Sequence, residues 1–72
     1  MLKKKIIYTN HATIRKYERD ISDNQILDTI ENPDYLLTDS TGRKISRKKI
    51  NGRLINVIYK DKERYIIIIT VY

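Results

Sequence analysis

The sequence predicts a single α+β domain in which two short N-terminal helices pack on one face of a mostly antiparallel sheet of about four strands. The first half of the chain contains two helix-start patterns, and the second half alternates short apolar runs with polar turns. Helices and strands that are segregated in this way are typical of the α+β class. The 72 residues suffice for one hydrophobic core, so residues 1–72 are assigned to a single domain.

Residues 4–8 are apolar and β-prone, and we expect a short first strand there, before the helices. Two residues that favour helix starts follow this strand. Thr9 and Asn10 are good N-cap residues, so a helix is predicted from about His11 to Asp20. At about 100° per residue, its apolar residues fall on one side, which we expect to face the core; they are Ile14, Tyr17 and Ile21.

The second helix has a start signal and a stop signal. Ser22 and Gln25 have the spacing of a capping box, in which each side chain bonds the backbone N–H of the other residue. Apolar residues then follow at helical spacing. The helix is predicted to end near Asn32, because Pro33 disfavours helical geometry in the residue before it.

The remainder of the chain predicts four strands, at residues 35–38, 43–50, 54–60 and 64–72. Asn51-Gly52 is the strongest hairpin signal, since a type I′ turn needs positive φ at both central residues. The last strand is apolar on both faces. We therefore expect this strand to lie inside the sheet or to be covered on both sides.

The composition favours an anionic partner. Basic residues outnumber acidic ones by 15 to 9, a formal charge of +6, so we expect RNA or another polyanion, or else an acidic protein. The absence of cysteine excludes disulfides and favours a reducing cytoplasm. One histidine and two glycines argue against a zinc site and a nucleotide-cofactor loop, so neither metal nor cofactor is expected. The basic start, Met1 to Lys5, precedes too short an apolar run for a signal peptide, and no run suits a membrane span.

The first helix carries the residues best suited to chemistry. His11, Arg15, Glu18 and Arg19 fall on one polar stripe. Arginine binds phosphate with a planar fork of donors, histidine can accept a proton near neutral pH, and Glu18 is expected to orient an arginine. This combination suits RNA cleavage through the 2′-hydroxyl. The alternative interpretation is a solvated helix face with an ordinary i,i+3 ion pair.

The second candidate region is the basic hairpin around Asn51-Gly52, whose arginines and lysines we interpret as a phosphate-tracking surface. The alternative is that its lysines protect a sheet edge from aggregation. The hydroxyl groups of Thr70 and Tyr72, at the end of the last predicted strand, are expected to reach the same substrate-binding region. The candidate substrate-binding residues are Arg43, Arg47, Lys49, Arg53, Thr70 and Tyr72.

A family resemblance adds to this interpretation. The segment from His11 to Ser22, HATIRKYERDIS, resembles the signature H-A-x-x-R-x-x-E-R-x-I-S of a small prokaryotic family described as a domain of unknown function. The resemblance spans nearly the whole chain, with further matches at Asn32-Pro33, Gly42-Arg43, Asn51-Gly52-Arg53 and Thr70-Val71-Tyr72. The layout of that family is similar to the RelE-type and BrnT-type ribonuclease toxins, which use basic and polar residues without a metal.

The resemblance implies a small toxin-type ribonuclease that cleaves RNA by general acid/base chemistry. His11 would be the general base, Arg15 and Arg19 would neutralise the scissile phosphate, and Arg47 or Lys49 would hold the backbone. An acidic antitoxin protein would be a partner. Two alternatives remain open: a non-enzymatic module that binds nucleic acid or protein through the same basic surface, and a homodimer formed through a sheet edge or face.

Overall fold

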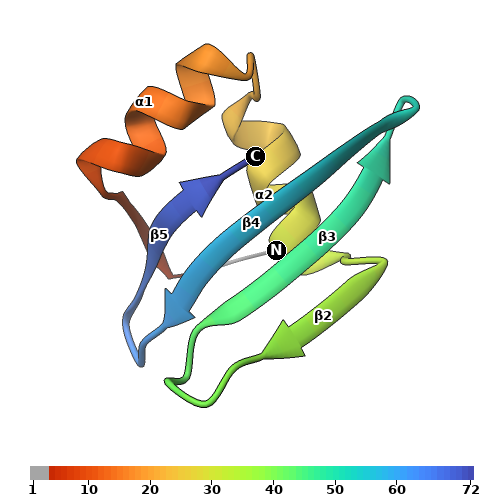
Figure 1. Cartoon of the computed structure of the whole chain (residues 1–72). Coiled ribbons are helices and arrows are strands. Elements are labelled where there is room, and N and C mark those ends of the chain that lie inside the picture. Colours follow the sequence, from red (N-terminus) through yellow and green to blue (C-terminus); the bar gives the residue numbers. More distant parts are fainter. Residues whose placement is uncertain (1–3) are drawn as a thin grey trace.

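The computed structural model describes residues 4–72, so Met1 to Lys3 of the basic start lie outside the described residues. The described chain contains two helices and five strands (Figure 1). In chain order these are β1 (Lys5–Tyr8), α1 (Asn10–Glu18), α2 (Asp23–Glu31), β2 (Tyr35–Thr38), β3 (Lys44–Ile50), β4 (Arg53–Asp61) and β5 (Tyr65–Val71). The predicted α+β class is confirmed.

The five strands form one mixed sheet in the order β1-β5-β4-β3-β2. The three hairpin-type pairings are antiparallel, whereas β1 pairs in parallel with β5. The sheet therefore has one strand more than the roughly four expected, because the short first strand expected before the helices joins it, and its parallel pairing makes the sheet mixed. β5 lies between β1 and β4, as its two apolar faces require.

The two helices occupy different positions on the sheet. α2 packs against β3 and β4, behind the sheet in Figure 1. α1 packs against β5 and β1 and begins where β1 ends. At this junction Thr9 donates from its backbone N to the Ile68 carbonyl (3.1 Å) and from Oγ1 to the Ile69 carbonyl (2.8 Å). The prediction that both helices share one face was therefore wrong for α1, which lies beside β5 where β1 has ended.

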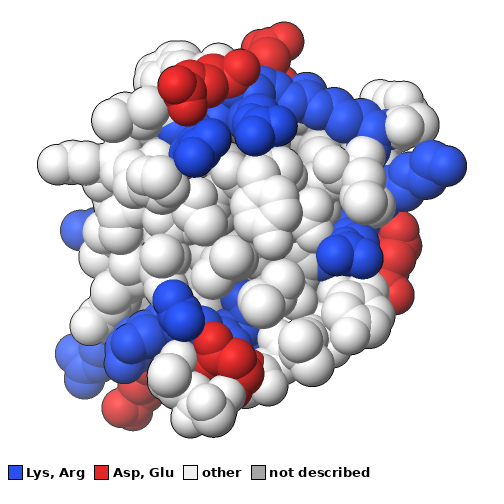
Figure 2. Space-filling view, in the orientation of Figure 1, with Lys and Arg blue, Asp and Glu red and all other residues white. Residues whose placement is uncertain are grey.

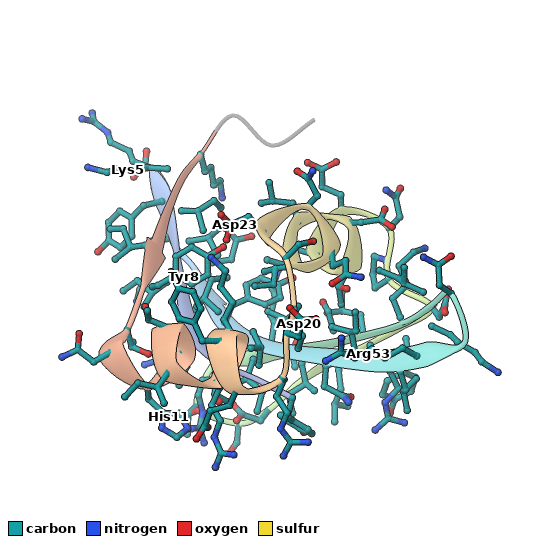
Figure 3. The ribbon with its side chains drawn as sticks, turned by 90° about the horizontal axis from the view of Figure 1, so that it is seen from above. Lys5, Tyr8, His11, Asp20, Asp23 and Arg53 are labelled. Atoms are coloured by element: carbon teal, nitrogen blue, oxygen red, sulfur yellow. The ribbon has the colours of Figure 1, made fainter. Side chains whose placement is uncertain are left out.

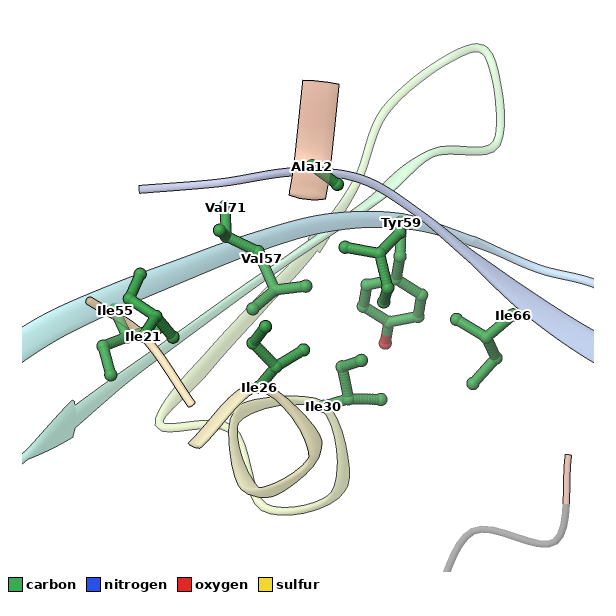
Figure 4. Close-up of a cluster of buried hydrophobic side chains, with 10 residues drawn as sticks. Ala12, Ile21, Ile26, Ile30, Ile55, Val57, Tyr59, Ile66 and Val71 are labelled. Atoms are coloured by element: carbon green, nitrogen blue, oxygen red, sulfur yellow. The ribbon is translucent and has the colours of Figure 1, made fainter. Parts of the chain in front are cut away.

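The hydrophobic core lies between α2 and the sheet, with Ala12 of α1 at its margin (Figure 4). Ala12 is fully buried, whereas Ile14 and Tyr17 are 56% and 76% exposed. The prediction that Ile14 and Tyr17 face the core was thus wrong. α1 approaches its neighbours through the small Ala12 side chain, and this contact turns the larger apolar side chains to solvent. Ile21 is buried as expected, although it lies beyond the end of α1.

The local signals in the sequence produce the turns and caps that they predict. Ser22 and Gln25 form both hydrogen bonds of the capping box, at 3.1 and 3.0 Å. Asn51 and Gly52 both have positive φ, at 52° and 79°, which is the geometry that the hairpin requires. None of the helices in the described part of the chain is long and apolar enough to cross a membrane.

Candidate functional site

α2 covers one face of the sheet. The opposite face, called the open face below, carries a transverse row of four polar or aromatic residues. The row runs Tyr72, Asn56, Arg47, Tyr35, from the end of β5 across β4 and β3 to β2. Asn56 and Tyr72 exchange two backbone hydrogen bonds, at 2.8 and 3.0 Å. Asn56 is paired with Arg47, and Arg47 with Tyr35. Because residues opposite one another in a sheet project to the same face, the four side chains are neighbours.

Arg47 is held in position by its two neighbours in this row. Its Nε donates a hydrogen bond to Oδ1 of Asn56 at 2.9 Å, and its guanidinium carbon lies 5.7 Å from the centroid of the Tyr35 ring. Asn56 is only 6% exposed, whereas Arg47 is exposed. A buried amide thus anchors a solvent-facing guanidinium whose two terminal nitrogens are suited to a bidentate anion.

The side-chain partner of Arg47 is a neutral amide, whereas several other basic residues of the described chain lie beside carboxylates. Carboxylates lie within 4 Å of six other basic residues, namely Lys4, Arg15, Lys16, Arg43, Lys44 and Lys48. In residues 4–72, no such pair involves Arg47 or Lys49. The positive charge of these two residues on the open face is therefore not neutralised by a carboxylate of the described chain.

The rest of the open face is mostly apolar. A second row lies beside the first and consists of Thr70, Ile58, Ile45 and Leu37. On the other side of the first row, Leu54 is paired with Lys49. Figure 2 shows this arrangement as an uncharged centre. Basic side chains, with some acidic ones beside them, lie along the upper margin and at the right, and a further group of both kinds lies at the lower left.

The predicted catalytic residues lie on α1, beside this face. His11 is exposed in the first turn of α1 and projects away from α2, to the same side as the open face (Figure 3). Arg15 is half-buried and lies 3.9 Å from Glu18. Arg19 is the exposed C-cap residue of the helix. In residues 4–72, no hydrogen bond to the imidazole of His11 is formed by a neighbouring side chain.

Two of the predicted binding residues do not join the open face. Arg43 lies in the turn before β3, where its Nε is 3.2 Å from Oδ2 of Asp39. Arg53 is paired with Ile50 at the hairpin and donates to the backbone carbonyl of Asp20 at 2.9 Å. Arg43 thus stabilises a local turn, and Arg53 ties the β3–β4 hairpin to the end of the first helical region. The sheet brings together the other four, which are Arg47, Lys49, Thr70 and Tyr72.

The shifted pKa values belong to clusters outside the row. Thr41, and then Arg43, hold the pKa of Asp39 at about 2. Bonds from Lys16 and Tyr8 lower the pKa of Asp23, while burial and then Asp23 raise the pKa of Tyr8. The Asp39 cluster holds the turn between β2 and β3. The Tyr8–Lys16–Asp23 cluster ties β1, α1 and α2 together.

The sequence analysis does not include Asn56 among the candidate site residues, although the sequence contains a pattern that predicts its contact with Arg47. A two-residue hairpin fixes the register of its strands, so the turn at Asn51-Gly52 places Asn56 opposite Arg47. A buried asparagine within an apolar strand needs a hydrogen-bond partner. Together these two facts identify the Arg47–Asn56 pair.

Comparison with known proteins establishes the family of this chain. A family model described as "Domain of unknown function (DUF4258)" matches residues 8–72. The chain therefore belongs to this family. No curated protein and no solved structure gives a significant match to the chain.

Proposed function

We propose that this domain is a small metal-independent ribonuclease that binds single-stranded RNA across the open face of its sheet. The proposal rests on the contacts of Arg47, an exposed arginine that is held by the neutral amide of Asn56 and by the ring of Tyr35. A carboxylate partner would cancel the charge of the guanidinium, whereas an amide orients it and preserves the charge. This arrangement favours an anionic ligand.

The row offers complementary contacts for a nucleotide strand. Arg47 and Lys49 are suited to bind phosphates, and Tyr35 and Tyr72 at the two ends of the row are suited to stack on bases. Tyr35 and Tyr72 are 51% and 44% exposed, so their rings are accessible. Stacking on aromatic side chains requires unpaired bases, and it tolerates any base. We therefore propose a single-stranded substrate with little sequence preference.

In the proposed reaction, His11 accepts the proton of a ribose 2′-hydroxyl. The 2′-oxygen then forms a bond to phosphorus, the bond from phosphorus to the 5′-oxygen breaks, and that oxygen takes a proton from water. The products are a 2′,3′-cyclic phosphate and a 5′-hydroxyl end. Arg15 and Arg19 would stabilise the extra negative charge on the phosphorane, which is the role that guanidinium groups play in phosphoryl chemistry.

The test is incubation of single-stranded RNA with the purified chain in the presence of a chelator. The proposal expects cleavage with cyclic phosphate ends, and it expects no cleavage of an oligonucleotide of the same sequence that lacks 2′-hydroxyls. His11→Ala is expected to abolish cleavage while RNA binding persists, because His11 is exposed and lies outside the row. Intact RNA after incubation with a folded sample would overturn the proposal.

A second candidate function is RNA binding without cleavage. Binding without cleavage is favoured because, within residues 4–72, no side chain orients the imidazole of His11 by a hydrogen bond. A general base is usually held in one tautomer by such a partner. In this case the chain would bind RNA in a salt-sensitive manner, the RNA would stay intact, and His11→Ala would change neither property.

A further inference from the structure

The outer edge of the sheet at β2 is apolar and unpaired. β2 ends the strand order and pairs with β3 on one side only. Three consecutive residues of this strand are large, apolar and about half exposed: Tyr35 at 51%, Leu36 at 48% and Leu37 at 47%. Edge strands are usually protected by lysine, proline or a bulge, and β2 contains none of these.

Both faces beside this edge carry cations from β3. On the open face, Arg47 is paired with Tyr35, and Lys49 follows it along the strand. On the α2 face, Lys44 and Lys48 already lie within 4 Å of carboxylates, so the cations of β3 without such a partner in the described chain are those of the open face. An added strand would therefore contact apolar side chains of β2 first and basic side chains of β3 behind them.

A groove continues from this edge on the α2 face. It has a volume of about 450 Å³, and Leu36, Ile30, Tyr59 and Ile66 contribute its apolar lining. Its polar lining is balanced in charge, with two basic and two acidic residues beside one amide: Lys4, Lys44, Glu31, Asp61 and Asn32. Leu36 thus belongs both to the edge and to the groove, so a segment that pairs with β2 has further apolar surface beside it.

We infer that β2 is the docking edge for an acidic, extended segment of a partner protein, which adds to the sheet as a sixth strand. Main-chain hydrogen bonds to β2 would hold the segment, and its apolar side chains would cover Leu36 and Leu37. Its carboxylates would face Arg47 and Lys49 of β3. This inference does not depend on the ribonuclease activity of the domain.

A second copy of the chain fits this edge less well. Each copy carries a formal charge of +6, so pairing β2 with β2 would bring two basic surfaces together. A strand of four residues also contributes little area compared with the roughly 800 Å² per partner of a stable interface. A longer segment meets both requirements if its acidic residues face Arg47 and Lys49 and its apolar residues extend into the groove.

The experiment is hydrogen exchange of the intact chain, measured by NMR, with a short peptide that alternates glutamate with valine. Alternate residues of an edge strand direct their N–H groups away from the neighbouring strand. At a peptide concentration about ten times the Kd, these β2 amides are expected to exchange about tenfold more slowly. A matched peptide that alternates lysine with valine is expected to leave the exchange unchanged.

Variants of exposed leucines locate the effect. Leu36→Ser and Leu37→Ser are expected to remove the protection, whereas Leu54→Ser, an equally exposed leucine on β4, is expected to retain it. Equal protection by both peptides, or protection on β1 in place of β2, would overturn the inference. A dimer seen by light scattering and abolished by Leu36→Ser would also overturn it, because the occupant would then be a second copy. The Leu36→Ser variant is expected to cleave RNA as the parent does. Loss of peptide binding can therefore be distinguished from loss of the proposed ribonuclease activity.

Discussion

Asn56 accepts a hydrogen bond from Nε of Arg47 at 2.9 Å and exchanges two backbone hydrogen bonds with Tyr72. Three strands thereby cooperate to fix one guanidinium on an otherwise largely apolar face. Because Asn56 is nearly buried and neutral, it restrains Arg47 without lowering the net charge of the surface. This relationship leads to the first two predictions.

Asn56→Ala should weaken RNA binding by roughly two- to tenfold, because a freed arginine side chain must give up about 0.5–1.5 kcal/mol of rotamer freedom when it binds. The free energy of unfolding should fall by about 1 kcal/mol through the lost hydrogen bond. Fluorescence anisotropy with labelled RNA and urea denaturation measure the two effects. Asn24→Ala, at an exposed position of α2, is the matched control and should change neither quantity.

Arg47→Lys should reduce RNA affinity by roughly tenfold or more, although the charge is kept. Lysine lacks the planar fork and cannot retain both the contact with Asn56 and a two-point contact with phosphate, and such charged hydrogen bonds contribute about 1.5–3 kcal/mol each. The control is Arg64→Lys, at an exposed arginine before β5. Equal affinity of the Arg47→Lys and Arg64→Lys variants for RNA would show that Arg47 does not bind it.

Ser22→Ala should lower the free energy of unfolding by about 1 kcal/mol, because the side chain of Ser22 accepts from the backbone N of Gln25 at the start of α2. Ser40→Ala, in the exposed turn after β2, should leave stability within about 0.5 kcal/mol of the parent. Urea denaturation of the three proteins measures this. RNA binding should stay unchanged in both variants, since neither serine lies on the open face.

Asp39 should make the turn between β2 and β3 sensitive to acid. Its carboxylate accepts from Thr41 and Arg43, which holds its pKa at about 2, below the ordinary value of 3.8. The stabilising effect is thus fully present above about pH 4 and is lost as the pH falls toward 2. The difference in stability between the parent and Asp39→Asn should shrink over this interval. An NMR titration that gives Asp39 an ordinary pKa would contradict this assignment.

The parts of the fold that depend on near neighbours could be predicted from the sequence. The capping box at Ser22 and the hairpin at Asn51-Gly52 arise from groups within three residues of one another, so their chemistry is visible in the chain. The hairpin also determines that Arg47 lies opposite Asn56. The central contact of the site could therefore be predicted from the sequence, by combining the hairpin register with the need of a buried Asn56 for a hydrogen-bond partner.

The parts that depend on distant segments could not be predicted in this way. Lys5 is paired with Tyr65 in the parallel register of β1 and β5, and no local pattern specifies that partner. The orientation of α1 follows from this pairing, because the helix must start beside Ile68. Ala12 therefore became the buried residue, and the larger Ile14 and Tyr17 were turned outward against the expectation from helical periodicity.

RNA is proposed to bind to the row of Tyr72, Asn56, Arg47 and Tyr35. The most direct test is an NMR titration of the labelled chain with a single-stranded oligonucleotide whose 2′-hydroxyls are methylated, so that it can bind without being cleaved. The largest chemical-shift changes are expected at these four residues and at Lys49, and they are expected to diminish as salt is added. Shifts confined to the α2 side of the sheet, or no shifts at low salt, would contradict it.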